Sequence, residues 1–198
     1  RIFGLGTLSG SRLKNPKYVE PAISEKEYGR YRPIEVIGTT DTRVEGITIA
    51  DSAFHSLMLV SPYKAGHPNE VQWTKIFTWR ANGDGINPFG NTLIEDCFIR
   101  TQDDSLYVNG LGIRRTVLWN DANGSSFVLT AMPQLTDRQL VVEDCDVIYA
   151  RAKWHHWSGG RVFNMRGEGG RAAGAGVIFR NLNIEDPRPT LQQFFICM

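Results

Sequence analysis

Three aspartates are the residues whose type and spacing could support catalysis. Asp84 lies in the segment Asn-Gly-Asp-Gly-Ile at 82–86, and Asp103 and Asp104 follow in Gln-Asp-Asp-Ser at 102–105. Each segment alone has an ordinary interpretation, because Asp-Gly is a common turn dipeptide and acidic pairs often only solvate a loop. The 19 residues from Asp84 to Asp103 are what connect the two segments into one candidate site.

A cluster of carboxyl groups suits the hydrolysis of a glycosidic bond. That reaction needs one protonated acid at the leaving oxygen and one carboxylate that acts on water or on the sugar. Like charges held together raise the pKa of one member, so that this group can keep its proton near neutral pH. A fold has little structural reason to gather three carboxylates that repel one another. We therefore predict that Asp84, Asp103 and Asp104 are catalytic.

Short runs of β-type residues, broken by Gly, Asn, Asp or Ser, must position these aspartates. In three of the runs apolar residues occupy every second position, which predicts strands with one buried face: residues 93–99, 141–147 and 178–184. Helical patterns are poor throughout. Residues 12–33 form a mixed, charged stretch with three prolines, which we interpret as an excursion loop.

The spacing of the runs predicts the fold class. Intervals of 28, 22, 19, 29 and 37 residues separate the apolar positions Ile49, Phe77, Ile99, Leu118, Val147 and Ile184. A minimum near 20 with longer insertions fits one coil of a solenoid, and the strands are too close together to alternate with helices. An antiparallel sandwich is the structural alternative. We predict an all-β, single-stranded, right-handed parallel β-helix.

This β-helix would extend over residues 1–198 as one domain. Because the chain starts at Arg1 without a Met and ends in an apolar segment, we expect it to be a portion of a longer chain. Stacked coils lie about 4.8 Å apart, so residues one coil apart lie one above the other. Asp84 would then lie beside the Asp103–Asp104 pair.

Composition argues against several classes of protein. The net charge is +1, and no element carries the basic excess of a nucleic-acid binder. No run approaches the length of a membrane span. Cys97 and Cys145 both follow Glu-Asp and are predicted to be buried thiols in stacked strands. Without a CxxC motif or a Cys/His cluster, we expect neither a metal nor a cofactor.

Aromatic and amide side chains supply candidate contacts to a sugar. The candidate substrate-binding residues are Asn82, Tyr107, Trp119, Asn123, Trp154, His155, His156 and Trp157. The four bulky residues at 154–157 are hard to bury together, which favours a sugar subsite there. Trp119 could instead end a strand and pack inside, and the two histidines could be ordinary surface residues.

The aspartate segments resemble the catalytic segments of the β-helical polysaccharide hydrolases of the polygalacturonase clan, which comprises glycoside hydrolase families 28 and 49 and has a pectate-lyase-like solenoid. The short separation, together with residues 119–124 and 154–157, looks more like family 49, the dextranases and isopullulanases. Gly4-x-Gly6-x-Leu8-Ser9-Gly10 is similar to the opening coil of such helices. The resemblance implies that Asp103 is the general acid and that Asp84 and Asp104 position and activate water, with inversion at the anomeric carbon.

Two departures bear on the substrate. Polygalacturonases carry Gly-His-Gly after the Asp pair and Arg-x-Lys further on, whereas this chain has Gly-Ser-Ser at 124–126 and Asn-Met-Arg-Gly at 164–167. The only basic pair close to the aspartates in sequence is Arg114-Arg115. We therefore predict an inverting, dextranase-like hydrolase that cleaves a neutral α-glucan and is secreted, although the chain shows no signal peptide. The alternatives are a polygalacturonase-like pectin hydrolase and a non-catalytic carbohydrate-binding β-helix.

Overall fold

The computed structural model describes residues 1–10, 32–52, 54–62, 67–79, 83–121, 124–130, 139–150, 162–165 and 176–185. All regular structure in these ranges is β-strand, and no helix in them is long and apolar enough to cross a membrane. The strands are β1 (Ile2–Phe3), β2 (Thr7–Ser9), β3 (Ile34–Ile37), β4 (Arg43–Glu45), β5 (Thr48–Ala50), β6 (Leu57–Val60), β7 (Asn69–Gln72), β8 (Lys75–Phe77), β9 (Ile86–Phe89), β10 (Thr92–Glu95), β11 (Phe98–Thr101), β12 (Leu106–Tyr107), β13 (Gly112–Arg114), β14 (Val117–Asn120), β15 (Phe127–Leu129), β16 (Leu140–Ala150), β17 (Phe163–Met165) and β18 (Val177–Ile184).

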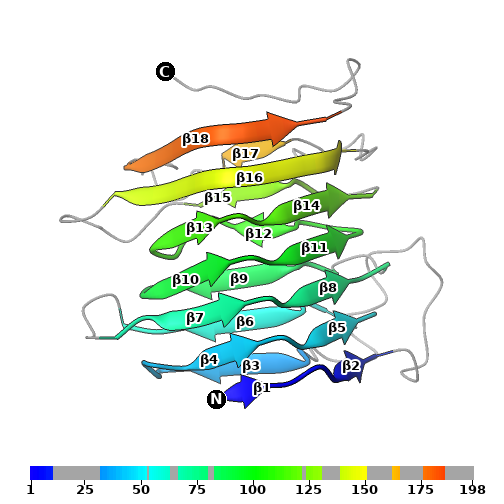
Figure 1. Cartoon of the computed structure of the whole chain (residues 1–198), viewed down its shortest axis with the longest axis vertical. Helices are drawn as coiled ribbons and strands as arrows, with labels where there is room; N and C mark the ends of the chain where they lie inside the picture. Colours follow the sequence, from blue (N-terminus) through cyan, green and yellow to red (C-terminus); the bar gives the residue numbers. More distant parts are fainter. Residues whose placement is uncertain are drawn as a thin grey trace.

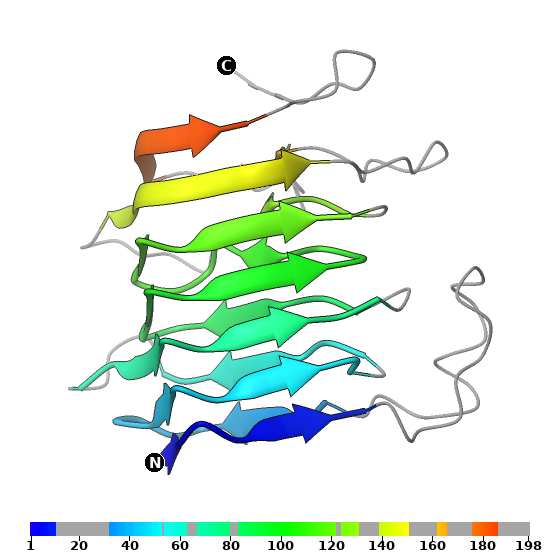
Figure 2. The same cartoon turned by 45° about the vertical axis from the view of Figure 1, so that its right-hand side comes forward.

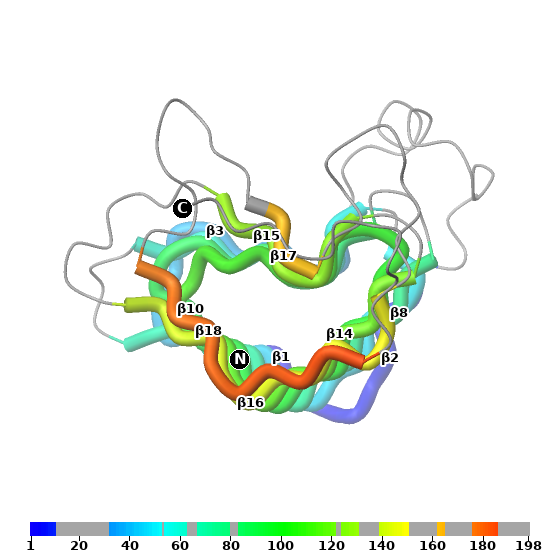
Figure 3. The backbone as a smooth tube through the Cα atoms, turned by 90° about the horizontal axis from the view of Figure 1, so that it is seen from above, coloured from blue at the N-terminus to red at the C-terminus, as the bar shows by residue number. Residues whose placement is uncertain are grey.

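The strands stack in parallel, one coil of chain above the next (Figures 1 and 2). A twelve-stranded sheet runs β1-β4-β7-β10-β13-β16-β14-β11-β8-β5-β2, with β18 on β16, and a six-stranded sheet runs β17-β15-β12-β9-β6-β3. Most strands therefore pair with the third strand along the chain. Seen from above, the tube retraces one outline level after level (Figure 3). This arrangement is compatible with the predicted β-helix, and the parallel pairing rules out an antiparallel sandwich for the described residues.

Two columns of aliphatic side chains form the core of the stack. Register places Val44, Val71, Ile94, Ile113 and Val142 one above another, and all five are buried. The second column contains Ile49, Ile76, Ile99, Leu118 and Val147. Each buried aliphatic side chain stabilises the fold by roughly 1.5–3 kcal/mol before entropy is subtracted. The predicted alignment was wrong at Phe77, because the register pairs Ile76 with Ile49 and Ile99 and so places Ile76 at the core position of that coil.

Each coil bends at one residue whose backbone is left-handed. Asp96, for example, has φ 54° and separates β10 from β11. The equivalent positions on the other coils all have positive φ and follow directly on paired residues: Gly4, Gly46, Trp73, Arg115, Asp144 and Asn181. Asp and Asn are among the non-glycine residues that tolerate this conformation best.

The bend changes which side chains face inward. Cys97 and Ile99 are buried, as the period of two predicted, but before the bend Ile94 is buried and Leu93 is only half-buried. Likewise Val142 rather than Val141 faces the core. The predicted inward phase was wrong before the bend, because the left-handed residue turns the chain and resets the alternation.

Threonines and cysteines form a column just after the bend. Thr74, Cys97, Thr116 and Cys145 each donate a hydrogen bond to the carbonyl two residues back, the thiols at 3.2 Å and the hydroxyls at 3.2 and 3.0 Å. Burial raises the pKa of the Cys97 thiol to about 12 and that of Cys145 to about 11. The prediction of buried thiols is confirmed for both.

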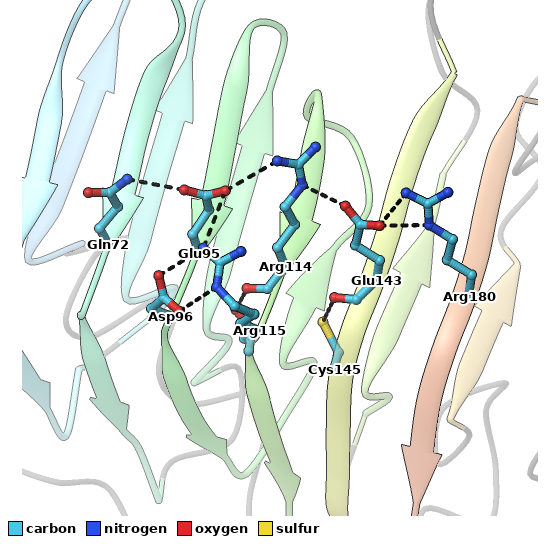
Figure 4. A network of polar contacts seen from close by, with 9 residues as sticks. Gln72, Glu95, Asp96, Arg114, Arg115, Glu143, Cys145 and Arg180 are labelled. Carbon is cyan, nitrogen blue, oxygen red and sulfur yellow. Dashed lines mark hydrogen bonds and ion pairs between the residues drawn. The ribbon is translucent and has the colours of Figure 1, made fainter.

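Outside the same bend, charged side chains alternate along the stack (Figure 4). Arg114 Nε lies 2.8 Å from Glu143 Oε1, and Arg180 Nε donates to Glu143 Oε2 at 2.6 Å. Arg115 donates to Asp96 and thereby lowers the pKa of that carboxyl. A lowered pKa contributes stability above the ordinary carboxyl pKa, which is lost as the pH falls through the lowered value. The contribution is small because Arg115 is exposed and Asp96 is partly exposed, with side-chain exposures of 48% and 30%.

The bend column predicts that Cys97→Thr is tolerated. Threonine occupies the equivalent position on the coils before and after, and its hydroxyl can donate to Glu95 O as the thiol does. We expect the free energy of unfolding to change by less than about 1.5 kcal/mol, measured by denaturant unfolding. Ile99→Thr is the matched control, since it puts the same hydroxyl between Ile76 and Leu118 and should cost about 2 kcal/mol or more. Equal costs for the two variants would contradict this account of the column.

Candidate active site

The turns that precede β9, β12 and β15 bring the predicted aspartates together. β9 pairs with β12 at Ile86 and Leu106, and Gly85 N donates to Asp104 O at 2.9 Å. One coil further, Ser105 N donates to Ser125 O at 2.8 Å. Continuing this register places Asp84 level with Asp104, rather than with Asp103 as the count of 19 residues suggested. The prediction that the two segments are stacked neighbours is confirmed, with the level shifted by one residue.

Asp84 and Asp104 are buried and share one phenol. Their exposed fractions are 4% and 3%. Tyr107 Oη donates to Asp84 Oδ2 at 2.8 Å and lies 3.2 Å from Asp104 Oδ2. The two carboxyl oxygens are therefore within about 6 Å of each other, since both lie at hydrogen-bonding distance from one oxygen. Because a phenol carries a single hydrogen, it can donate to only one of them at a time.

His55 joins this group from the preceding coil. Its Nε2 lies 3.3 Å from Asp84 Oδ2, and its side chain is 17% exposed. The imidazole stacks on the Phe54 ring at 3.9 Å between centroids and on the Tyr107 ring at 6.1 Å. Sequence reasoning missed His55, because a single histidine before a strand gives no signal until the register of the coils is known.

Asp103 has a different environment from its neighbour. It is half-buried, and its Oδ1 accepts a hydrogen bond from Asp104 N at 2.9 Å. The Asp103 carbonyl accepts from Thr101 Oγ1 and from Asn120 Nδ2, both at 2.7 Å. These bonds fix the backbone of the turn while the Asp103 side chain is the more exposed of the two. The site thus contains one buried carboxyl pair and one carboxyl nearer to solvent.

Gly124 and Ser125 hold the turn from the following coil. Ser125 N donates to Asp104 Oδ1 at 2.8 Å. Gly124 has φ 65°, and a Cβ there would lie 2.3 Å from Asp104 N and 2.5 Å from Asp103 C. Only glycine fits a backbone that is both left-handed and packed this closely. The turn that carries Asp103 and Asp104 therefore depends on a glycine one coil away.

Trp119 lies on the outer side of β14, between two neighbours in its column. The guanidinium of Arg100 lies 4.5 Å from the indole centroid, and the Tyr149 ring lies 4.8 Å from it on the next coil. The indole N–H donates to Asp121 at 2.8 Å, and Asp121 also pairs with Arg100. Both faces of the indole thus have protein neighbours, and its N–H is bound to Asp121. Its role in binding sugar stays a prediction.

The other predicted residues divide between the site and undescribed segments. Tyr107 lies against both Asp84 and Asp104, as described above. Arg114 and Arg115 pair with carboxylates at the bend of the twelve-stranded sheet. Among the described residues, no group of three or more His, Cys, Asp or Glu side chains could hold a metal ion. Six predicted sugar contacts lie outside the described residues: Asn82, Asn123, Trp154, His155, His156 and Trp157.

Stacked parallel strands that carry a buried pair of aspartates define the class only coarsely, as an all-β protein with a carboxyl site. Comparison with known proteins adds a family direction. No protein-family model matches the chain. Two curated proteins named Dextranase, from Arthrobacter sp. (strain CB-8) and Arthrobacter globiformis, are each 26% identical to it over 113 residues. The match covers 56% of the chain but 18% of each relative, so the chain spans a small part of their length. This similarity suggests a distant, glycoside hydrolase-like relationship.

The Gly124 contact predicts that Gly124→Ala displaces the Asp103–Asp104 turn. We expect the variant to lose more than about 1 kcal/mol of unfolding free energy, since alanine is strained at positive φ, and a further amount from the overlap with Asp104 N. Gly38→Ala is the matched control, because Gly38 has φ 71° and nothing lies within 4 Å of a Cβ there. Denaturant unfolding of both variants separates the two effects. If Gly124→Ala costs no more than Gly38→Ala, the turn does not depend on this close approach.

Proposed function

We propose that the protein is a glycoside hydrolase that cleaves an α-glucan of the dextran type, built on a right-handed, pectate-lyase-like parallel β-helix. The observation that carries the proposal is the buried pair of Asp84 and Asp104 on successive coils, bridged by Tyr107. Burying two carboxyl groups side by side is costly for a fold, and glycoside hydrolysis is a reaction that uses such a group. The distant similarity to proteins named Dextranase supports the same class.

The geometry supports a division of roles among the three aspartates. In an inverting enzyme the acid and the base are about 6.5–9.5 Å apart, which leaves room for a water molecule. Asp84 and Asp104 approach more closely than that, so the two suit a joint role in holding and activating water. Asp103 is half-buried and directly precedes Asp104 in the chain. It is then the candidate acid that protonates the leaving oxygen. This assignment accords with the roles that the family resemblance implies.

A neutral glucan is the substrate that we favour. Ser125 stands where a polygalacturonase would carry histidine, and its backbone N–H is used to hold Asp104. Arg100, the cation next to the Asn120–Asp121 segment, is paired with Asp121 and stacked on Trp119. An acidic polymer would call for cations directed at the substrate instead. Because dextran is a polymer, we also propose that the protein acts outside the cell.

Asp103→Asn tests the assignment of the acid. Asparagine keeps the size of the side chain but cannot donate a proton to the leaving group, so the rate of glucan hydrolysis should fall by about a hundredfold or more. The measurement is the release of reducing ends from dextran, with pullulan and polygalacturonate tested in parallel. Asp144→Asn is the control, since Asn181 occupies the equivalent bend position one coil later and asparagine fits there.

Four outcomes would count against the proposal. Full activity of Asp103→Asn would show that another group is the acid. Cleavage of polygalacturonate but not of dextran would instead establish the pectin hydrolase, and measurable binding of oligosaccharides with no cleavage would establish a carbohydrate-binding β-helix. The anomeric form of the first product, followed by proton NMR, reports the stereochemistry, and retention would contradict the roles given to Asp84 and Asp104.

A further inference from the structure

We propose that His55 is a positioning residue of this site, whose protonated imidazole holds Asp84 and offsets the charge of the Asp84–Asp104 pair. This inference rests on the proposed function and adds to it a fourth side chain and a pH dependence. His55 does not reach the reacting bond in this account. It acts through Asp84, to which its Nε2 lies at 3.3 Å.

The position of His55 follows from the same register that aligns the aspartates. Ser56 N donates to Asp84 O at 2.9 Å, and Leu57 pairs with Ile86. His55 is therefore level with Asp84, which is level with Asp104 on the next coil. Three successive coils thus present a histidine and two aspartates at one place of the stack. Both the histidine and Tyr107 Oη approach the same atom, Asp84 Oδ2.

Stacking restricts how the imidazole can turn. The Phe54 ring lies almost parallel to the imidazole, with 13° between the ring planes. The plane of the Tyr107 ring is inclined to the imidazole by 27°. Rings held in this way lose little further freedom when Nε2 approaches Asp84. A restricted donor keeps one carboxyl oxygen in place more effectively than a mobile side chain would.

A carboxyl oxygen 3.3 Å from His55 Nε2 would stabilise the protonated imidazole. Asp84 and Asp104 are acidic groups on the following two coils, and Tyr107 is a neutral phenol between them. On the other side, the Arg32 guanidinium lies 5.2 Å from the Phe54 ring and is paired with Glu35. Asp84 is thus in direct contact with the imidazole, whereas this cation is paired with Glu35. Histidine changes its charge between about pH 5 and 8. Loss of its proton would remove one positive charge from beside the two carboxyl groups.

The alternative is that His55 only fills space beside Phe54. The two readings differ in what glutamine would do at this position, because its Nε2 can donate as the imidazole Nε2 does but carries no charge. Because glutamine resembles the uncharged histidine, we expect His55→Gln to have a kcat at the wild-type optimum that is lowered to the level of wild type on its alkaline limb, and to lose the decline of kcat on the alkaline side between pH 5 and 8. His55→Ala should lower kcat by at least about tenfold, as expected for losing a hydrogen bond to a charged group, with little change in KM.

The matched controls are His67→Gln and His67→Ala, since His67 is exposed on another coil. Thermal unfolding of every variant checks that each is folded, and His55→Gln decides the question if His55→Ala does not fold. The inference is overturned if His55→Gln keeps the wild-type pH profile, or if the alanine variants at 55 and 67 behave alike.

A measurement independent of turnover separates this inference from the proposed function. NMR of the imidazole nitrogens should show Nε2 of His55 as a proton donor whose signal changes in Asp84→Asn, while the signals of His67 do not move. If the protein cleaves none of the polysaccharides, the proposed function fails, and this spectrum still decides whether His55 holds Asp84. If the protein cleaves dextran but the spectrum shows no response to Asp84→Asn, the role of His55 fails alone.

Discussion

Parallel hydrogen bonding between successive coils is the constraint on which the rest of this structure depends. Each strand takes its register from the strand one coil earlier, so a residue is placed by its level in the stack more than by its neighbours in the chain. Val71, Ile94 and Ile113 meet in the core for this reason, although about twenty residues separate each from the next. The same register brings Asp84 level with Asp104. Core and candidate site are thus two results of one pairing pattern.

The left-handed bend residues divide each coil into segments with independent inward phases. At Asp96 and Asp144 the backbone turns within a run that reads as one strand in the sequence. The turn costs conformational energy at each coil, and a hydrogen bond from the residue just after the bend to the carbonyl two residues back returns part of it, as with Cys97 Sγ to Glu95 O. Repetition of the bend on every level keeps the sheets in register. This regularity allows a turn elsewhere on the coil to carry strained or buried polar groups.

The two sides of the molecule treat carboxylates in opposite ways. At the bend, Glu95 and Glu143 are matched by arginines on adjacent coils, and the side chain of Arg114 is partly exposed (Figure 4). Before β9 and β12, Asp84 and Asp104 are buried and meet each other across one phenol, with His55 as the basic neighbour. Structural pairing of the first kind removes repulsion between carboxylates. The second arrangement preserves some of it, which is the condition under which a carboxyl group can hold a proton for chemistry.

The sequence by itself determined the all-β character, the coil-length recurrence and the stacking of the Asp84 segment on the Asp103–Asp104 segment. These follow from period-two patterns and from intervals near 20 residues, which are local or nearly local properties. Only the tertiary structure decided the level of each residue, because a shift of one residue, as at Ile76 or Asp104, leaves the pattern almost unchanged but exchanges the faces of the strand. The same holds for His55 and Gly124 in their contacts with the aspartates, and for Tyr107 in its contact with Asp84. Those contacts are made between coils, and no spacing along one coil specifies which side chain of the next will meet them.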